Sequence, residues 1–308
     1  MTTPDASDRI TALRRNLGRT GIWSTPPENY GVDPGDLAAT VEKLGFGSLW
    51  LGGSHLAPDA FTGLVALLDG SSRLIVGTGI ASIWGREASD MRQGADTLSQ
   101  GFPGRFILGL GVSHAPAVED LGRSYDRPYS AMERYLDEMN HPAGTTGAPG
   151  APGERAVRVL AALGPRMLEL SRDEADGAHP YFSPVGHTAF ARQVLGRGKL
   201  LIPEQAVVLS GGRPAALAGA RAYAHRYLQL PNYVSNLRRF GFGDNDTGGG
   251  GSDRLIDAII PHGASVIAER VRQHLQAGAD HVLLQPIGPD GAFAPGDLPH
   301  LAEAVAGL

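Results

Sequence analysis

Short apolar runs alternate with longer amphipathic segments over most of the 308-residue chain. Apolar runs rich in β-branched residues predict strands, whereas apolar residues three and four positions apart predict helices. About eight such repeats predict an α/β fold, specifically a single (β/α)8 TIM barrel. The expected strands are 19–24, 48–51, 73–80, 105–110, 155–161, 175–179, 205–209 and 281–285. The expected helices are 33–44, 58–68, 87–100, 129–139, 165–175, 188–195, 213–228 and 267–277.

The segment 73–116 has the most informative pattern. Its first apolar run ends in Gly77 and Gly79, which indicates a buried strand that opens into an unusual backbone conformation. A helix follows, and the next strand leads into the glycine-rich turn 109–116. Backbone N–H groups at such a turn can bind a phosphate or another anion without a charged side chain. The alternative is that the two glycines only allow tight strand packing.

Three segments lie outside this alternation. Residues 1–17 are polar and charged, so they are expected to form an N-terminal extension of the barrel. The stretches 141–153 and 244–253 are rich in Gly with Pro, Thr or Asp, which is typical of flexible insertions. The whole chain, residues 1–308, is therefore expected to form one domain with insertions.

Composition narrows the class of partner. The 27 basic and 32 acidic residues give a net charge of -5, which provides no electrostatic reason to expect nucleic acid or an anionic membrane as a partner. The chain has no cysteine, so disulfides and thiolate chemistry are excluded. No apolar run approaches the ~20 residues of a membrane span. Because residues 1–17 also lack the apolar centre of a secretion signal, the expected location is the cytoplasm.

In a parallel barrel the functional residues follow the carboxyl ends of the strands. That rule selects uncharged segments that contain histidine, and they include no cluster of acidic and imidazole groups for a metal centre. The ten histidines show no HExxH or HxH spacing, and no GxSxG or GxxxxGK[ST] pattern occurs. A catalytic metal, a serine hydrolase and a P-loop enzyme are therefore not expected. The selected segments are 23–24, 52–55, 79–82, 111–114, 177–179 and Gln285.

Several longer segments resemble a known family. LIVGTGIASIWGREA and GRFILGLGVSHAP are similar to segments of the bacterial-luciferase-like oxidoreductases, as are LGFGSLWL, LAALGPRMLEL, ADGAHPY, GHTAFARQVLG, PEQAVVL and AGADHVLLQPIG. Within this family, the segments resemble more narrowly the mycobacterial and actinobacterial branch that is predicted to use the 8-hydroxy-5-deazaflavin coenzyme F420. It implies a homodimeric barrel that transfers hydride between this coenzyme, bound at its C-terminal mouth, and a small organic substrate.

The resemblance also implies site residues. Gly79-Ile80 matches a non-proline cis peptide behind the coenzyme ring, with Ile80 against the ring. Residues 111–115 match a loop around the ribityl and phosphate portion, and residues 177–179 match a loop near the distal tail. The implied coenzyme-binding residues are Gly53, Ser54, Gly79, Ile80, Ala81, Gly111, Val112, Ser113, His114, Ala115, Gly177, Ala178 and His179.

One departure from the family concerns the proton donor. Several deazaflavin-dependent relatives carry an Asp-His pair after the second strand, where this chain has Gly53 and Ser54, with His55 one position further. His114 and His55 are the candidate catalytic residues, because an imidazole can donate and accept a proton near neutral pH. The alternative for His114 is a helix-capping role, and for His179 a role in shaping its loop.

Three alternative functions stay open. The barrel could use FMN as a luciferase-like monooxygenase or reductase, or it could bind a flavin-type cofactor without turnover. A sugar-phosphate aldolase or isomerase would need a lysine or carboxylate at a strand end. The chain has only Lys43 and Lys199, so this third class is disfavoured.

Overall fold

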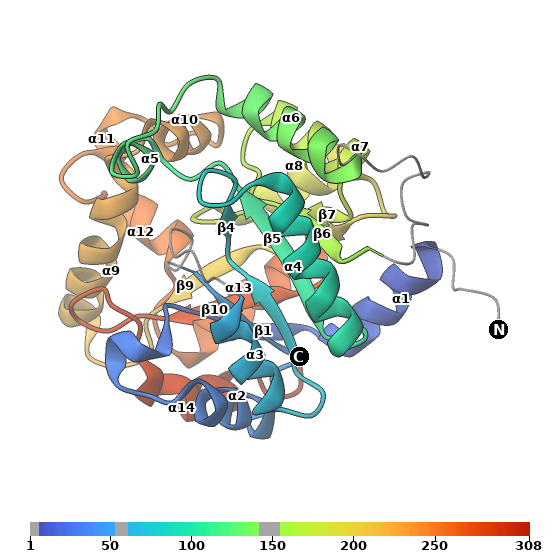
Figure 1. The fold of residues 1–308 in the computed structure, drawn as a ribbon. Helices are drawn as coiled ribbons and strands as arrows, with labels where there is room; N and C mark the ends of the chain where they lie inside the picture. Colours follow the sequence, from blue (N-terminus) through green and yellow to red (C-terminus); the bar gives the residue numbers. More distant parts are fainter. Residues whose placement is uncertain (1–5, 53–60, 142–154) are drawn as a thin grey trace.

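The fold is a parallel sheet surrounded by helices (Figure 1). The computed structural model describes residues 6–52, 61–141 and 155–308. All eight predicted strands are confirmed as strands of this sheet, and β4 (Ala81–Ser82) pairs with β5 beside the main path. In sheet order the main strands are β8 (Leu200–Leu201), β7 (Gly177–Ala178), β6 (Val157–Leu160), β5 (Phe106–Gly111), β3 (Ile75–Thr78), β2 (Ser48–Leu51), β1 (Thr20–Ser24), β10 (Val282–Pro286) and β9 (Glu204–Val207).

The two ends of this sheet meet, because β8 and β9 are consecutive pieces of one segment. The N–H groups of Leu200, Ile202 and Glu204 donate to carbonyls in and beside β7. On the other side, the carbonyls of Leu201 and Pro203 accept hydrogen bonds from N–H groups in and just before β10. With β8 and β9 counted as one strand, the nine strands of the path form eight barrel positions, so the predicted (β/α)8 architecture is confirmed.

The eight predicted helices are also present, with ends shifted by a few residues. Asp33 illustrates why they begin where they do: its carboxylate accepts hydrogen bonds from the N–H groups of Gly35 and Asp36, and Pro34 occupies the first turn. Residues 58–60 of the predicted helix 58–68 lie outside the described residues. The helices are α2 (Pro34–Lys43), α3 (Thr62–Asp69), α4 (Ala88–Gly101), α6 (Pro128–Asn140), α7 (Pro165–Glu174), α8 (Val185–Leu195), α9 (Arg213–Leu228) and α13 (Ala264–Gln276).

Most of the further helices were not anticipated from the sequence; a helix start after His114 was, because a helix-capping role was considered for that residue. The N-terminal extension contains α1 (Ala6–Leu17), in which Ile10, Leu13 and Leu17 are buried against the barrel interior. Their helical spacing was hidden by the many charged residues between them. None of the helices in the described ranges is long and apolar enough to span a bilayer. The remaining helices are η1 (Pro27–Tyr30), α5 (Ala115–Glu119), α10 (Pro231–Arg239), α11 (Asp244–Thr247), α12 (Asp253–Ile259), η2 (Pro295–Asp297) and α14 (Leu298–Val305).

The structure describes the two predicted insertions to different extents. The segment 244–253 contains α11, and the Asp246 carboxylate accepts hydrogen bonds from Ser252 Oγ at 2.7 Å and Gly243 N at 3.1 Å. Of the segment 141–153, residues 142–153 lie outside the described residues. The flexibility of both insertions stays a prediction.

Buried neutral histidines connect the strands to their surroundings. His281 Nδ1 donates to the carbonyl of Gly18 at 3.1 Å, so its Nε2 accepts from Ser48 Oγ at 2.7 Å. His274 is held similarly between Thr188 Oγ1 at 2.8 Å and Gln205 Oε1 at 3.0 Å. Burial lowers the pKa of His281 to about 4 and that of His274 to about 3. Both imidazoles are therefore neutral in the folded protein at pH 7.

We expect these histidines to make the fold sensitive to acid. An unfolded histidine titrates near 6.5, so between about pH 6.5 and 4 the unfolded chain binds more protons than the folded chain. Each buried histidine then lowers the free energy of unfolding by about 1.4 kcal/mol for each pH unit of acidification. Urea denaturation at pH 7.0 and 5.5 measures this loss. His274→Gln should reduce the pH dependence and His141→Gln, at an exposed position, should not; equal stability of the wild type at both pH values would contradict the expectation.

Candidate active site

A cavity of about 620 Å³ opens where the strands end. Ligands of parallel barrels bind at this end, and small-molecule sites typically measure about 300–1,000 Å³. The wall combines the ends of β1, β3, β5, β6 and β7 with helices α9 and α10. The lining residues discussed below are Trp23, Gly79, Ile80, Val112, Ser113, His114, Gly164, Pro165, Arg166, His179, Tyr181, Tyr227, Tyr233 and Arg239.

The floor of the cavity depends on two glycines. The Gly79-Ile80 peptide is cis, as the resemblance implied. A Cβ atom on Gly79 would lie 2.3 Å from Nε1 of Trp23, and one on Gly111 would lie 2.6 Å from Cδ1 of Ile80. Both distances are far below van der Waals contact. Glycine at these positions therefore leaves room for the Trp23 indole and the Ile80 side chain beside the cavity.

The end of β5 brings His114 to the cavity. Ser113 has a positive φ of 56°, and the next residue, His114, is the extended N-cap residue of α5. The His114 ring lies 5.5 Å from the ring of Tyr233 on α10. Tyr125 Oη donates to the Ser113 carbonyl at 3.3 Å, which helps to fix this turn. His114 is thus held against the cavity by a strand end on one side and by α10 on the other.

His179 also lines the cavity and offers it a hydrogen-bond acceptor. Its Nδ1 donates to the carbonyl of Ile202 at 2.7 Å, and its ring lies 5.0 Å from that of Trp50. Burial lowers the pKa of His179 to about 4, so the ring is neutral at pH 7. In this tautomer Nε2 carries a lone pair and no proton. His179 is therefore suited to accept a hydrogen bond and not to act as an acid near neutral pH.

The structure brings together only part of the predicted site. Gly79, Ile80, Val112, Ser113, His114 and His179 line the cavity. Four others lie behind it in paired strands, Ala81 and Gly111 in β4 and β5, and Gly177 and Ala178 in β7, while Ala115 begins α5. The last three predicted residues, Gly53, Ser54 and His55, lie outside the described residues.

A hydrogen-bonded tyrosine network under the cavity was not predicted. Tyr181 Oη lies 2.9 Å from Tyr227 Oη and 2.8 Å from Tyr223 Oη, and Tyr223 Oη lies 3.3 Å from the carboxyl of Glu204. Burial raises the pKa of Tyr181 and Tyr223 well above the ordinary value, so both stay hydroxyls. The sequence contains little indication of this network, because Tyr181 lies beyond a strand end and Tyr227 lies far away along the chain, in α9.

A cationic wall was also missed. Helix α7 begins at the cavity with Gly164 as N-cap and Pro165 in the first turn, and no side chain in the described part of the chain caps its N–H groups. The Arg166 guanidinium lies 4.0 Å above the Tyr129 ring, and Arg239 reaches the same wall from the end of α10. Free N–H groups and two guanidinium groups together favour an anion. The segment LAALGPRMLEL contained this signal as a strand followed by a Gly-Pro helix start.

Three lining residues contain polar atoms that need a partner. Trp23 Nε1, Ser113 Oγ and His179 Nε2 are buried and have no hydrogen-bond partner within the described ranges. Buried polar groups are rarely left unpaired in folded proteins. The cavity therefore fits a ligand that has an aromatic or apolar body, polar edges and an anionic end.

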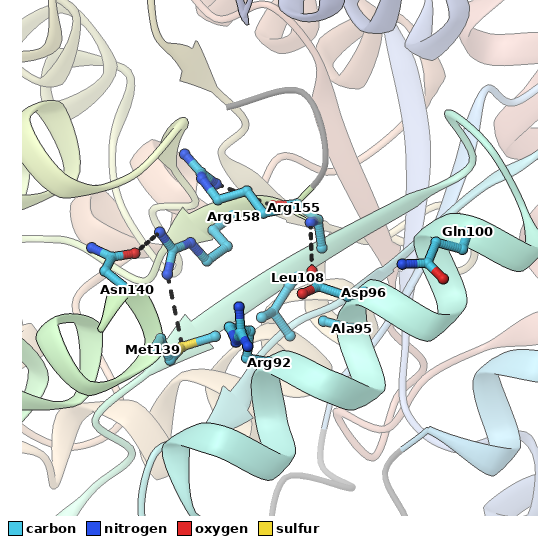
Figure 2. Close-up of a pocket in the computed structure, with 10 residues that line it drawn as sticks. Arg92, Ala95, Asp96, Gln100, Leu108, Met139, Asn140, Arg155 and Arg158 are labelled. Atoms are coloured by element: carbon cyan, nitrogen blue, oxygen red, sulfur yellow. Dashed lines mark hydrogen bonds between the residues drawn. The ribbon is translucent and has the colours of Figure 1, made fainter. Parts of the chain in front are cut away.

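A second cavity, of about 180 Å³, lies outside the barrel between β6, α4 and α6 (Figure 2). Arg158 alternates with Val157 and Val159, which face the barrel interior, so it points outward. Its guanidinium donates to Asn140 Oδ1 at 2.7 Å and contacts Met139 Sδ at 3.9 Å. Asp96 on α4 accepts a hydrogen bond from the N–H of Ala156 at 2.9 Å. These contacts fasten the start of β6 to α4 and α6 at a distance from the barrel mouth.

Comparison with known proteins identifies the family. The model of the luciferase-like monooxygenase family matches residues 19–199, more than half of the chain. The chain belongs to this family. The matched region supplies the part of the cavity from Trp23 to Tyr181, whereas Tyr227, Tyr233 and Arg239 lie beyond it.

The luciferase-like chain is also similar to individual proteins. A Mycobacterium tuberculosis protein that carries the name coenzyme F420-dependent oxidoreductase is 26% identical over 249 residues, which cover 68% of this chain and 70% of that protein. This similarity places the luciferase-like chain among relatives that are oxidoreductases.

Solved structures share the fold of the luciferase-like chain. The coenzyme F420-dependent tetrahydromethanopterin reductase of Methanopyrus kandleri superposes with a TM-score of 0.67 at 16% identity, covering 93% of this chain and 98% of that one. A type II Baeyer-Villiger monooxygenase from Pseudomonas putida, in complex with FMN, gives a TM-score of 0.64 at 13% identity, with 94% and 96% covered. At these identities the likeness concerns the fold alone, and it is shared by F420-dependent and FMN-binding proteins.

Proposed function

We propose that this luciferase-like chain binds coenzyme F420 at the barrel mouth and transfers hydride between the coenzyme and a small organic substrate. The observation that carries the proposal is the cavity, which combines an aromatic and apolar floor with buried unpaired polar atoms and a cationic wall. A deazaflavin has the matching parts, namely a fused ring with polar edges and a phosphate-bearing tail. The mycobacterial relative named for F420 supports the choice of coenzyme.

Named residues would hold each part of this coenzyme. Trp23 and Ile80 provide the surface for the ring, and Ser113 Oγ and His179 Nε2 are available to its polar edges. Arg166, Arg239 and the N-terminus of α7 would hold the anionic tail. The coenzyme supplies the hydride chemistry when bound, so the protein has to position it, exclude water and move protons.

His114 is proposed to exchange a proton at the ring edge. It lines the cavity, and strand β5 and helix α10 hold it in place from two sides. An imidazole group is chemically able both to accept and to donate a proton. His55, the other proposed proton-transfer residue, follows β2 and stays a candidate on the family resemblance alone.

Two finer points also remain proposals. The first is the homodimer implied by the family resemblance. The second is the cofactor: FMN is the alternative, as in a luciferase-like monooxygenase or reductase, and the Pseudomonas putida structure with FMN favours it as the second candidate. A barrel that binds such a cofactor without turnover is distinguished by absorbance, because its bound coenzyme would stay unchanged when substrate is added.

A binding titration should show which of the two cofactors the protein binds more tightly. We expect saturable binding of F420 that is at least about tenfold tighter than that of FMN, a difference of about 1.4 kcal/mol in binding free energy. Arg166→Gln should weaken binding of FMN, which carries a phosphate, more than binding of riboflavin, which does not, because only the phosphate meets the guanidinium. Tight binding of FMN with no binding of F420 would reverse the assignment.

A further inference from the structure

Glu204 is a carboxyl group buried below the cavity without a cationic partner in the described parts of the chain. It begins β9 and is only 1% exposed. Its hydrogen-bond partners there are the N–H of Phe182, 3.1 Å from Oε2, and the hydroxyl of Tyr223, 3.3 Å from Oε1. A carboxylate buried with so few partners is unfavourable, so the neutral acid is the stable form. Burial accordingly raises the pKa of Glu204 to about 8.

The tyrosine hydroxyls form a path from this carboxyl to the cavity. Tyr223 Oη lies 2.8 Å from Tyr181 Oη, and Tyr181 Oη lies 2.9 Å from Tyr227 Oη. Tyr181 and Tyr227 line the cavity, whereas Tyr223 and Glu204 lie behind them. Gln285 Oε1 lies 2.9 Å from Tyr181 Oη and 3.1 Å from Tyr223 Oη, so it is an alternative acceptor for the proton of either hydroxyl when that proton is turned out of the path.

Each hydroxyl in this path can accept one hydrogen bond and donate another. The acid proton of Glu204 can therefore point to Tyr223, the Tyr223 proton to Tyr181, and the Tyr181 proton to Tyr227. The Tyr227 proton then points toward the cavity. Within the described residues, the titratable groups that interact with Glu204 are these three tyrosines and Tyr233 on α10, and burial raises the pKa of all four. The tyrosines therefore pass a proton on without standing as phenolates.

We propose that Glu204 is the proton reservoir of this site and that Tyr223, Tyr181 and Tyr227 conduct its proton to the substrate. The inference rests on the proposed hydride transfer, in which a carbonyl or imine carbon takes up hydride. Glu204 acts through the tyrosines and so is a positioning and storage group, distinct from His114 at the ring edge.

The proposed step is balanced in protons and electrons. Hydride, with its two electrons, would pass to the substrate carbon from the reduced coenzyme, which would itself be oxidised, and the substrate oxygen or nitrogen takes the Tyr227 proton. Tyr227, Tyr181 and Tyr223 each receive a proton from the neighbour behind, and Glu204 ends as a carboxylate. His114 receives the proton released at the ring edge. Solvent then takes the proton from His114 and returns one to Glu204.

Infrared spectroscopy of the protein without coenzyme gives the first test. At pH 7 we expect a carboxylic-acid carbonyl band that is lost in Glu204→Gln and shifted in Tyr223→Phe, because Tyr223 is the neighbour to which the acid proton points. The band should disappear as the pH rises above about 8. Tyr135→Phe is the matched control and should leave the band unchanged, because it removes another buried tyrosine hydroxyl, on α6, which donates to the carbonyl of Arg86 at 2.9 Å. A neutral-pH spectrum without any band assignable to Glu204 would overturn the proposal.

Turnover with F420 gives the second test. We expect the wild type to lose rate between pH 7 and 9, as Glu204 becomes a carboxylate. Glu204→Gln and Tyr223→Phe should each slow turnover about tenfold or more at pH 7 and remove this loss of rate, while Tyr135→Phe should keep the wild-type rate and profile. Full activity of both variants with an unchanged pH profile would overturn the relay. If the wild type fails to bind F420, the proposed function is wrong, whereas the infrared result still decides whether Glu204 stores a proton coupled to Tyr223.

Discussion

Replacing Gly79 by Val is expected to abolish coenzyme binding. The new Cβ would lie 2.3 Å from Nε1 and 2.9 Å from Cδ1 of Trp23, so the indole has to move. The Tyr181 ring lies 5.2 Å from the indole on the cavity side and limits where it can go. The displaced indole would then occupy the space proposed for the coenzyme ring. Titration with F420 should show no saturation at concentrations that saturate the wild type.

The control for this variant is another glycine. A Cβ on Gly63 in α3 would meet nothing within 4 Å among the described residues, so Gly63→Ala should bind F420 as the wild type does. Circular dichroism of Gly79→Val checks that the barrel is still folded, because a misfolded variant would lose binding for a different reason. Normal binding by a folded Gly79→Val protein would show that this glycine does not support the ring.

Replacing His114 by Ala should slow turnover by ~10²-fold while coenzyme affinity changes little, since a positioned acid or base typically contributes that much. The imidazole lines the cavity at its edge and has no place in the floor or the cationic wall. Steady-state rates and an F420 titration of the same preparation separate the two effects.

The matched control is His141→Ala, because His141 is exposed at the end of α6 and contacts Asp137 at 3.0 Å, away from the barrel mouth. It should keep full activity. If His114→Ala also keeps full activity, the proton at the ring edge is handled by His55 or by water. A large loss of F420 affinity in His114→Ala would assign the residue to binding instead.

Much of the barrel could be predicted from the sequence because each strand is a short buried run, such as Ser48–Leu51, in which every residue is buried. Helix α1 was missed since its apolar stripe of Ile10, Leu13 and Leu17 is sparse, and these residues become informative only once a barrel end exists to receive them. The division between β8 and β9 was also hidden. Pro203 interrupts the strand assignment there, while hydrogen bonding continues on both sides.

The site residues that directly follow a strand could be predicted from the sequence, whereas those that distant helices bring to the cavity could not. Gly79, Ile80 and His114 follow strands directly, so the rule for strand ends finds them. Tyr227, Tyr233 and Arg239 come from α9 and α10, and their place at the cavity depends on how these helices fold over the mouth. Glu204 lies one residue before the predicted strand 205–209 and was not a candidate residue, because its importance comes from Tyr223 and Phe182, which lie far apart in the chain.

The three tryptophans are placed so that their fluorescence reports separate events. Trp23 lines the cavity, whereas Trp50 is completely buried beneath Gly77 and does not line it. Trp84 is tied to the loop after β5, because its Nε1 donates to the Val112 carbonyl at 2.8 Å. A ligand in the cavity should therefore quench the emission of Trp23. Rearrangement of the loop after β5 should alter the emission of Trp84, and the emission of Trp50 should change only when the barrel unfolds.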